Sequence, residues 1–406
     1  MFNSISARKS NKYRFILYYL IMFSFTGVIC FVLLEYVIAK FYYSNVGQVS
    51  YKEFDSELGW LNKPGRYFIK PTHAFNKVPL YINKYGLRNK DIILDKKNNN
   101  KRIIVLGDSF TFSNAIPEEY IFTSQLEKTL NQDSTEKYTI INAGVEGYGN
   151  IQELLLMRRL AGNEIKGDIY LLMIFINDIL DDLCLSYGDA TENLIQPKYI
   201  LGKDNKLFLS RSPQKQLSES GNLIPVRKNE NKFVTIETMK IKFASFAQAK
   251  PQIIYILNKL GFNIKFPRVP GLISGWFDNN ILNKGLPIMR ESIKEIKEEA
   301  EKNQASLYVC LIPSPLQVYP DTYGPLLKKT FPNDKQVESW LNNKLIPQEF
   351  IKKICDELEI PFLDLLPILY ENNNKDYFIP MEGHFNERGH SIVGSSLAKF
   401  IIQSKK

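Results

Sequence analysis

Five short stretches of the chain are mostly apolar and rich in Val, Ile and Leu. They are residues 102–109, 138–144, 168–178, 306–314 and 361–369. Stretches with helical character lie between or after them, at residues 122–130, 152–161, 289–302 and 390–402. Strands that are apolar on both faces and alternate with helices are typical of a parallel sheet that helices cover on both sides. We therefore predict an α/β fold with a doubly wound, mainly parallel sheet.

The N-terminal run of residues 15–34 contains no charged residue. A helix of this length covers about 30 Å, which is the hydrocarbon thickness of a bilayer. A cleaved signal peptide would have a shorter apolar region, of roughly 7–15 residues, followed by small residues. Here the run continues into the bulky sequence EYVIAKFYYS. We therefore predict an uncleaved transmembrane anchor at residues 15–39.

Charge is distributed unevenly around this predicted anchor. Lys40 is the one basic residue that follows closely, whereas four precede the run: Arg8, Lys9, Lys12 and Arg14. The positive-inside rule then places residues 1–14 in the cytoplasm and the rest of the chain in the periplasm or outside the cell. Residues 41–100 are interrupted by Gly and Pro. We expect them to lead from the membrane to the core as short strands and loops.

The alternation of strands and helices lapses between residues 185 and 285, where Pro, Lys and Asn are frequent. We predict that the core has two parts, residues 101–184 and 286–406. Residues 185–285 are then an insertion or cap over the carboxyl edge of the sheet, with one helix near residues 252–260.

Composition excludes several classes of protein. Apolar residues make up 44% of the chain and charged residues 23%, which are globular values. The net charge is +9, but the four basic residues at the N-terminus account for much of it, so a nucleic-acid partner is not predicted. Cys30, Cys184, Cys310 and Cys355 lack the CxxC spacing of a zinc site, and their pairing is open. We predict neither a metal nor a cofactor.

Polar residues cluster where the predicted strands end, and again just before the last helix. These clusters are Gly107-Asp108-Ser109, residues 142–149, Asn177-Asp178 and Glu382-Gly383-His384. In doubly wound sheets such strand ends form the functional site. Asp178, Asp181 and Asp182 together could suggest a metal, but acidic residues are favoured at a helix N-terminus in any case.

These residue types suit acyl transfer. A serine hydroxyl needs an adjacent base to take its proton, and His384 can supply one to Ser109. The reaction also needs donors where the oxyanion develops, and the N–H groups of Ser109 and Gly147 and the amide of Asn177 are donors of that kind. The alternatives are that Ser109 is only a helix N-cap and that Asn177 only caps a turn. His390 is expected to pack at the start of the last helix.

The order GDSFTF, NAGVEGYG, FIND and EGHFNERGH resembles the four blocks of the SGNH/GDSL hydrolase superfamily. It is most similar to the membrane-anchored members associated with bacterial cell-surface polysaccharides, as are the segments GWLNKPG, YGLRNKD and LIPSPLQVYP. The resemblance implies a three-layer, flavodoxin-like fold. It also implies that Ser109 is the nucleophile and an oxyanion donor, that Gly147 and Asn177 are the other donors, and that His384 is the base.

The chain departs from the family pattern at three places. Ser113 and Ile176 stand where many members have Gly, and the usual Asp two or three residues before the catalytic His is missing. Glu382 is the candidate for that acid, one methylene longer. The alternative is that Glu382 is an exposed loop acid and that the site is a Ser–His dyad.

The function expected from the residues and the resemblance together is an exported serine esterase. Its substrate would be an acyl group, most plausibly O-acetyl, on a cell-envelope glycan. One alternative is a polysaccharide O-acetyltransferase with the same site and a multipass acyl-donor partner. The other is an inactive SGNH-fold binding or scaffold protein.

Overall fold

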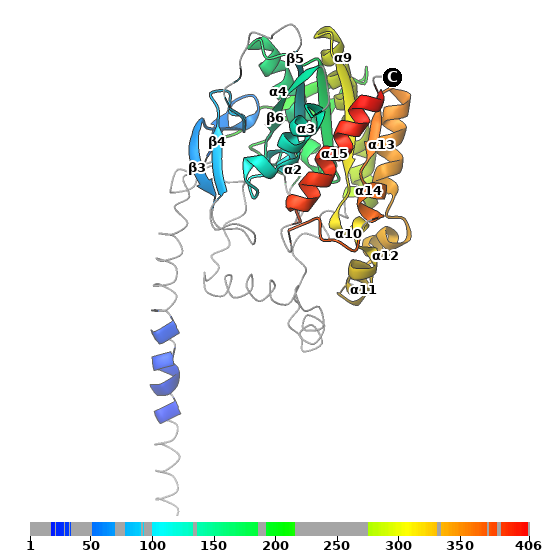
Figure 1. The fold of residues 1–406 in the computed structure, drawn as a ribbon. Helices are drawn as coiled ribbons and strands as arrows, with labels where there is room; N and C mark the ends of the chain where they lie inside the picture. The colour runs from blue at the N-terminus through cyan, green and yellow to red at the C-terminus, as the bar shows by residue number, and fades with distance from the viewer. Residues whose placement is uncertain are drawn as a thin grey trace, which may run out of the picture. The chain divides into compact units, whose positions relative to one another are not determined.

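The computed structural model describes most of the chain (Figure 1). The described residues are 18–20, 22–27, 29–31, 33, 51–69, 78–90, 92, 100–132, 136–185, 192–215, 275–330, 334–371, 373–379 and 383–404. Two units are distinguished: Met1–Val49 with Lys228–Lys250, and Ser50–Arg227 with Pro251–Lys406. The larger unit contains all five strands of the main sheet.

The smaller unit is described only at helical positions between Tyr18 and Leu33, and their side chains are exposed. Among the described residues, no helix has the length and apolar character needed to cross a membrane. The anchor predicted at residues 15–39 lies partly outside the described residues.

The main sheet is formed by five parallel strands in the order β11-β10-β7-β5-β6. These strands are β5 (Asn100–Gly107), β6 (Lys137–Gly144), β7 (Ile169–Phe175), β10 (Ser306–Ile312) and β11 (Phe362–Asp364). Every residue of the central strand β7 is buried, as expected for a strand with helices on both faces. The predicted doubly wound parallel sheet is confirmed.

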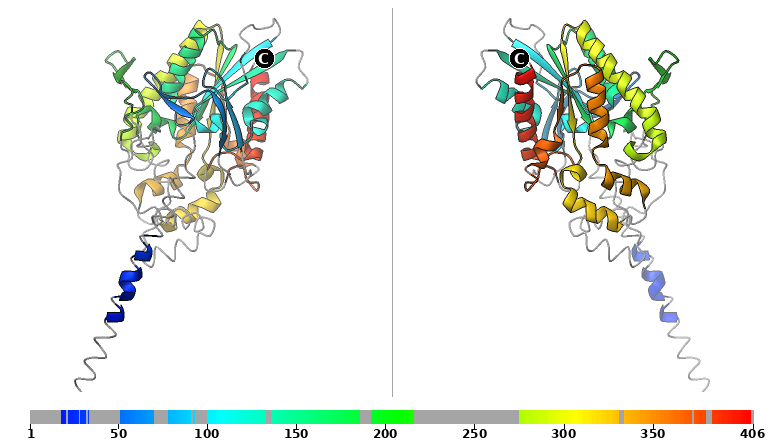
Figure 2. Two further views of the ribbon diagram at one scale, coloured as in Figure 1. Left: turned by 90° about the vertical axis from the view of Figure 1, so that its left-hand side faces the viewer. Right: turned by 90° about the vertical axis from the view of Figure 1, so that its right-hand side faces the viewer.

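Helices cover both faces of the sheet. On one face α3 (Phe122–Leu130) packs against α15 (Glu387–Ser404), and on the other α4 (Asn150–Gly162) packs against α9 (Asn279–Lys302) (Figure 2). The short helix α5 (Asp178–Asp182) also contacts α9. Helix α13 (Ile346–Glu357) contacts β10 and β11.

In the part of the chain that the structure describes, three hairpins lie outside the main sheet. Before the core, β1 (Lys52–Asp55) pairs with β2 (Gly59–Asn62), and β3 (Gly65–Ile69) pairs with β4 (Val78–Ile82). These strands confirm the short strands expected in residues 41–100. Within the predicted insertion, β8 (Lys198–Leu201) pairs with β9 (Leu207–Arg211). The helix predicted near residues 252–260 lies outside the described residues, and the domain boundaries stay predictions.

The end of the sheet differs from the prediction for residues 361–369. Strand β11 ends at Asp364, and α14 (Leu366–Tyr370) follows, with Pro367 near its start. The side chain of Asp364 accepts a hydrogen bond from the N–H of Leu366 at 2.9 Å, which turns the chain into this helix. Proline fits the first turn of a helix, so a run that is apolar throughout divides into a strand and a helix.

In the described residues between β10 and β11, four helices were not predicted. They are α10 (Pro315–Val318), α11 (Pro320–Thr330), α12 (Lys335–Asn342), which begins after the cap Asp334, and α13. The four cysteines are all described and all free, and Cys184, Cys310 and Cys355 are buried.

Candidate active site

Ser109 lies at the carboxyl end of β5, as the first residue of the short helix α2 (Ser109–Phe112). The N-cap of this helix is Asp108, whose side chain accepts a hydrogen bond from the N–H of Phe110 at 2.9 Å. Ser109 is therefore not the N-cap, and its hydroxyl is available for another role. Gly107 permits the tight turn, because a Cβ there would lie 2.2 Å from Oγ1 of Thr111.

His384 reaches Ser109 from the other end of the chain. Its Nε2 lies 2.7 Å from Oγ of Ser109, a hydrogen-bonding distance. The imidazole packs against the ring of Phe110, with 4.8 Å between ring centroids. Backbone bonds between Ile379 and the 383–384 turn hold this loop: Ile379 donates to the carbonyl of His384 and accepts from Gly383. The structure brings together the predicted nucleophile and the predicted base.

The predicted acid Glu382 lies outside the described residues, so its role stays a prediction. Asp108 also lies close to the nucleophile: its Oδ2 is 3.4 Å from Oγ of Ser109. Burial raises the pKa of Asp108, although the N–H of Phe110 and the charge of His384 act in the opposite direction. Asp108 is committed to capping α2, so we assign it no catalytic role.

Gly147 follows β6 in a turn closed by a hydrogen bond from the N–H of Tyr148 to the carbonyl of Val145, at 3.2 Å. Its φ of +79° is in the left-handed region, which favours glycine. The indole of Trp60 lies directly beside it, and a Cβ at position 147 would be 3.3 Å from this ring. A residue with a side chain here would be strained and would crowd the turn.

Asn177 follows β7 and is the N-cap residue of α5, but its side chain makes no cap hydrogen bond. Instead its amide Nδ2 donates to Oδ2 of Asp181 at 2.8 Å. The side chain of Asn177 therefore does not cap α5, and the bond to Asp181 orients its amide group. The role of Asn177 as an oxyanion donor stays a prediction.

A group of buried carboxyls lies on α4 and α5, close enough to Asp108 to interact with it electrostatically. Burial, followed by the nearby charge of Asp108, raises the pKa of Glu153 well above its ordinary value. Burial, and then Glu153, does the same for the pKa of Asp178. Burial raises the pKa of Asp182 to about 6. Within the part of the chain that the structure describes, no such group has the geometry of a metal site.

His390 has the packing role expected from the sequence. It is buried at the start of α15, and its Nδ1 accepts a hydrogen bond from the N–H of Phe122 at 3.1 Å. Burial, helped by the charges of Arg88 and His384, lowers the pKa of His390 to about 3. The ring is therefore neutral and joins α15 to α3.

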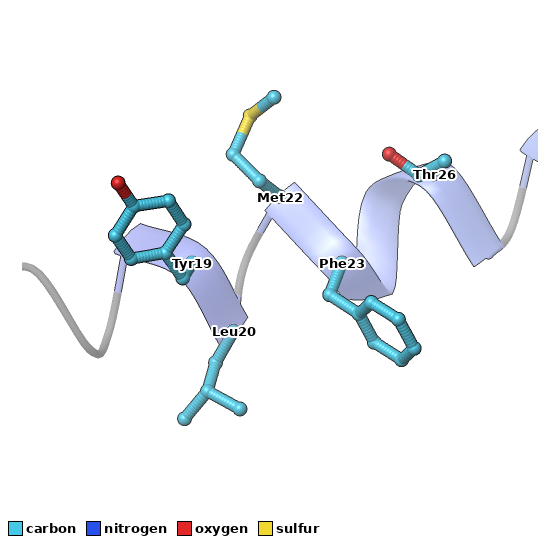
Figure 3. Close-up of a pocket in the computed structure, with 5 residues that line it drawn as sticks. All are labelled: Tyr19, Leu20, Met22, Phe23 and Thr26. Carbon is cyan, nitrogen blue, oxygen red and sulfur yellow. The ribbon is translucent and has the colours of Figure 1, made fainter.

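An apolar hollow lies in the smaller unit and involves none of these residues (Figure 3). It is lined by Tyr19, Leu20, Met22, Phe23 and Thr26. These side chains point outward from one helix, and Phe23 is 81% exposed.

No protein-family model and no curated protein matches the chain. Several solved structures are similar to it. A member of the lipolytic protein G-D-S-L family from Veillonella parvula is 13% identical, with a TM-score of 0.35, and 74% of this chain and 96% of that chain are covered. A lipase/acylhydrolase from Enterococcus faecalis is 10% identical, with a TM-score of 0.37 and coverage of 75% and 96%. A catalytic mutant of an acetylxylan esterase from Geobacillus stearothermophilus is 11% identical, with a TM-score of 0.37 and coverage of 76% and 96%.

The geometry of the site indicates the class of chemistry. A serine at the carboxyl end of a parallel strand, with an imidazole nitrogen 2.7 Å from its hydroxyl, has a nucleophile and a base in contact. Ser109 and His384 have the arrangement of a serine hydrolase.

Proposed function

We propose that this protein is a serine esterase of the SGNH type that removes small acyl groups, principally O-acetyl, from cell-envelope glycans. The observation that carries the proposal is the distance of 2.7 Å between Nε2 of His384 and Oγ of Ser109. An inactive scaffold would have no need to keep these two groups in register, which favours an enzyme over a binding protein.

The reaction proceeds in two halves. Oγ of Ser109 attacks the ester carbonyl carbon while Nε2 of His384 takes the hydroxyl proton. The tetrahedral oxyanion is stabilised by the N–H groups of Ser109 and Gly147 and by the amide of Asn177. The carbon–oxygen bond to the alcohol then breaks, and His384 gives its proton to the leaving oxygen. A water molecule, deprotonated by His384, then attacks the acyl-enzyme. The bond between the acyl carbon and Oγ of Ser109 breaks, His384 returns the proton to Oγ, and the carboxylic acid is released.

The glycan substrate and the cellular location are parts of the same proposal. The glycan is supported by the resemblance of GWLNKPG and the later blocks to the polysaccharide-associated subgroup. Attachment to a membrane, with the catalytic unit outside the cytoplasm, is supported by the uncharged run of residues 15–34. The exposure of Tyr19 and Phe23, at 67% and 81%, suits side chains that contact lipid.

The test uses the full chain in detergent with p-nitrophenyl acetate as substrate and a fluorophosphonate as a covalent probe. We expect wild-type protein to release p-nitrophenol and to be labelled, and Ser109→Ala to do neither while its thermal unfolding stays unchanged. Ser339→Ala on α12 is the matched control. Labelling that survives in Ser109→Ala would show that another residue is the nucleophile.

A transferase would use the same serine and would differ in the acceptor of the acyl group. Adding an unacetylated glycan to the acetylated enzyme distinguishes the two reactions. An esterase releases acetate at a rate independent of the glycan, whereas a transferase gives an acetylated glycan at the expense of acetate.

A further inference from the structure

The peptide between Glu146 and Gly147 is held from outside its own loop. Its carbonyl oxygen, that of Glu146, accepts a hydrogen bond from Nε1 of Trp60 at 3.1 Å and another from Nζ of Lys52 at 3.3 Å. Both donors come from the β1–β2 hairpin, more than eighty residues earlier in the chain.

The geometry of a peptide group makes this contact relevant to catalysis. A trans peptide is planar, so its C=O and N–H point in opposite directions. Donors that fix the carbonyl of Glu146 therefore fix the direction of the N–H of Gly147. Gly147 has no side chain that would restrict its backbone. Hydrogen bonds from outside the loop therefore have to hold its φ of +79°. Hydrogen bonds to the carbonyl also polarise the group and strengthen its N–H as a donor.

The side chain of Glu146 is held as firmly as its carbonyl. Its Oε2 accepts a hydrogen bond from the hydroxyl of Tyr51 at 2.5 Å and lies 3.0 Å from Nζ of Lys52. Nδ2 of Asn114 donates to Oε1. Burial raises the pKa of Glu146, but Lys52, Tyr51 and the charge of His384 together bring it below the ordinary value. The influence of His384 places this carboxylate within electrostatic range of the catalytic pair.

Trp60 is itself rigid. Its side chain is buried, and its ring meets the ring of Tyr148 edge to face with 5.6 Å between centroids. The hydroxyl of Tyr148 donates to the carbonyl of Trp60. Nζ of Lys52 lies 5.8 Å from the centroid of the indole. Because the indole N–H is fixed in this way, its hydrogen bond also fixes the position of the Glu146 carbonyl.

We propose that Trp60 and Lys52 are positioning residues for the oxyanion hole: they hold the carbonyl of Glu146 so that the N–H of Gly147, in the same peptide, points at the oxyanion. This inference rests on the proposed function, because it needs Gly147 to be an oxyanion donor. In this proposal the β1–β2 hairpin contributes to catalysis through Lys52 and Trp60 and is more than a connection between the membrane and the core.

The decisive variant is Trp60→Phe, which removes the indole N–H and keeps an aromatic ring in the core. An oxyanion donor acts mainly in the transition state, and removing one costs about 10²- to 10³-fold in kcat. A donor that is present but points in the wrong direction should lower kcat less than a donor that is removed. We therefore expect kcat for p-nitrophenyl acetate to fall at least about tenfold, with KM within about twofold of wild type. An alkyl boronic acid, whose adduct with Ser109 is tetrahedral, should bind more weakly by the same factor.

Lys52→Met provides a second, independent test, because it keeps the aliphatic stem and removes the donor. We expect a smaller fall in kcat, largely restored in Lys52→Arg. The double variant Trp60→Phe with Lys52→Met should lose less than the product of the two single losses, since both residues act through one carbonyl. If Trp60→Phe does not fold, the comparison of Lys52→Met with Lys52→Arg decides the question.

The controls are Trp340→Phe and Lys352→Met. Trp340 is buried in a separate cluster with Leu316 and Val337, and Lys352 forms an exposed pair with Asp356. Both variants should keep kcat. The inference is overturned if Trp60→Phe raises KM at unchanged kcat, or if kcat falls while boronate binding is unchanged. These outcomes are distinct from a failure of the proposed function, in which Ser109→Ala would keep its activity.

Discussion

Nε2 of His384 lies 2.7 Å from Oγ of Ser109, although 275 residues separate the two along the chain. The contact depends on the order of the sheet. Ser109 follows the strand β5 near the middle of the sheet, whereas His384 belongs to the loop before α15, the helix that returns to pack on α3. The pair therefore forms only when the first and last parts of the core are folded together.

We expect His384→Ala to lower kcat by at least about 10³-fold, because the serine then has no base, with residual catalysis from the oxyanion hole. The double variant with Ser109→Ala should be no worse than Ser109→Ala alone, since members of one catalytic unit are not additive. Initial rates with p-nitrophenyl acetate measure this. If kcat of the double variant is many-fold lower than kcat of Ser109→Ala, the two residues act separately.

Most of the fold could be predicted because its strands are buried on both faces. Residues 103–106 are apolar, and all of them are buried in β5. The position of Ser109 could be predicted because polar residues at the ends of parallel strands lie at one edge of the sheet. The pairing of His384 with it was predicted from the chemistry that a serine nucleophile needs and from the resemblance of the four sequence blocks. Ser113 stands at a position where the SGNH/GDSL pattern that the sequence resembles often has Gly. Its φ of +56° lies in the left-handed region, and its hydroxyl donates to the carbonyl of Phe110.

Other features had no local signature in the sequence. Trp60 reaches the carbonyl of Glu146 across 86 residues, and neither residue type nor spacing indicates such a contact. Glu153 sits in a helical stretch, where a glutamate normally faces solvent, yet it is fully buried. The helices α10 and α11, which were not predicted, begin at Pro315 and Pro320. Proline costs little at the first position of a helix, so these residues do not exclude a helix there.

The burial of His390 makes stability depend on pH. Its pKa is about 3 in the folded protein, against an ordinary value of about 6.5 in the unfolded chain. Below pH 6.5 the unfolded state binds a proton that the folded state refuses, so the stabilisation present above pH 6.5 is lost as pH falls toward 3. Between pH 7 and pH 5 the loss should be about 2 kcal/mol.

His390→Gln isolates this effect. Wild type and variant have the same carboxyl groups, so the contribution of these groups cancels in the difference between the two free energies of unfolding. The variant should be less stable than wild type at pH 7, and the difference in the free energy of unfolding should be smaller by about 2 kcal/mol at pH 5. Urea unfolding at each pH measures it, and kcat at pH 7 should be unchanged. A difference that stays constant with pH would show that His390 takes up its proton as readily in the folded protein as in the unfolded chain.

Glu153 gives a dependence of the opposite sign. Burial, and then the charge of Asp108, raises its pKa well above the ordinary value, so the folded protein holds a proton that the unfolded chain releases. This costs about 1.4 kcal/mol of stability for each pH unit from about 4.5 up to the raised pKa. Glu153→Gln is neutral without a proton, so its stability relative to wild type should increase from pH 5 to pH 8.

Urea unfolding of Glu153→Gln at pH 5 and pH 8 tests this. Glu298→Gln, on the exposed side of α9, is the matched control and should show no such change, since the Glu298 side chain is 51% exposed. If Glu153→Gln is less stable relative to wild type at pH 8 than at pH 5, the carboxyl is ionised in the fold and a cationic partner must stabilise it.

Glu382 is predicted to orient His384 from two residues upstream. Its carboxylate has to reach Nδ1 while Nε2 faces Ser109, and Gly383 between them has a φ of +85°, which only glycine adopts easily. A turn in that conformation can take up the extra methylene of Glu relative to Asp. We expect Glu382→Gln to lose at least about 100-fold in kcat, which is about 2.7 kcal/mol of barrier.

The matched variants separate an orienting acid from an ordinary loop residue. Glu382→Asp keeps the charge and shortens the reach, so it should retain part of the activity. Glu387→Gln removes a nearby exposed carboxylate at the start of α15 and should leave kcat unchanged. Because the acid acts through the imidazole, Glu382→Gln combined with His384→Ala should be no worse than His384→Ala alone. If Glu382→Gln keeps nearly wild-type kcat while His384→Ala is inactive, no acid at this position orients the base. Catalysis would then rest on a Ser–His dyad, with His384 held by its packing against Phe110 and by the backbone bonds to Ile379.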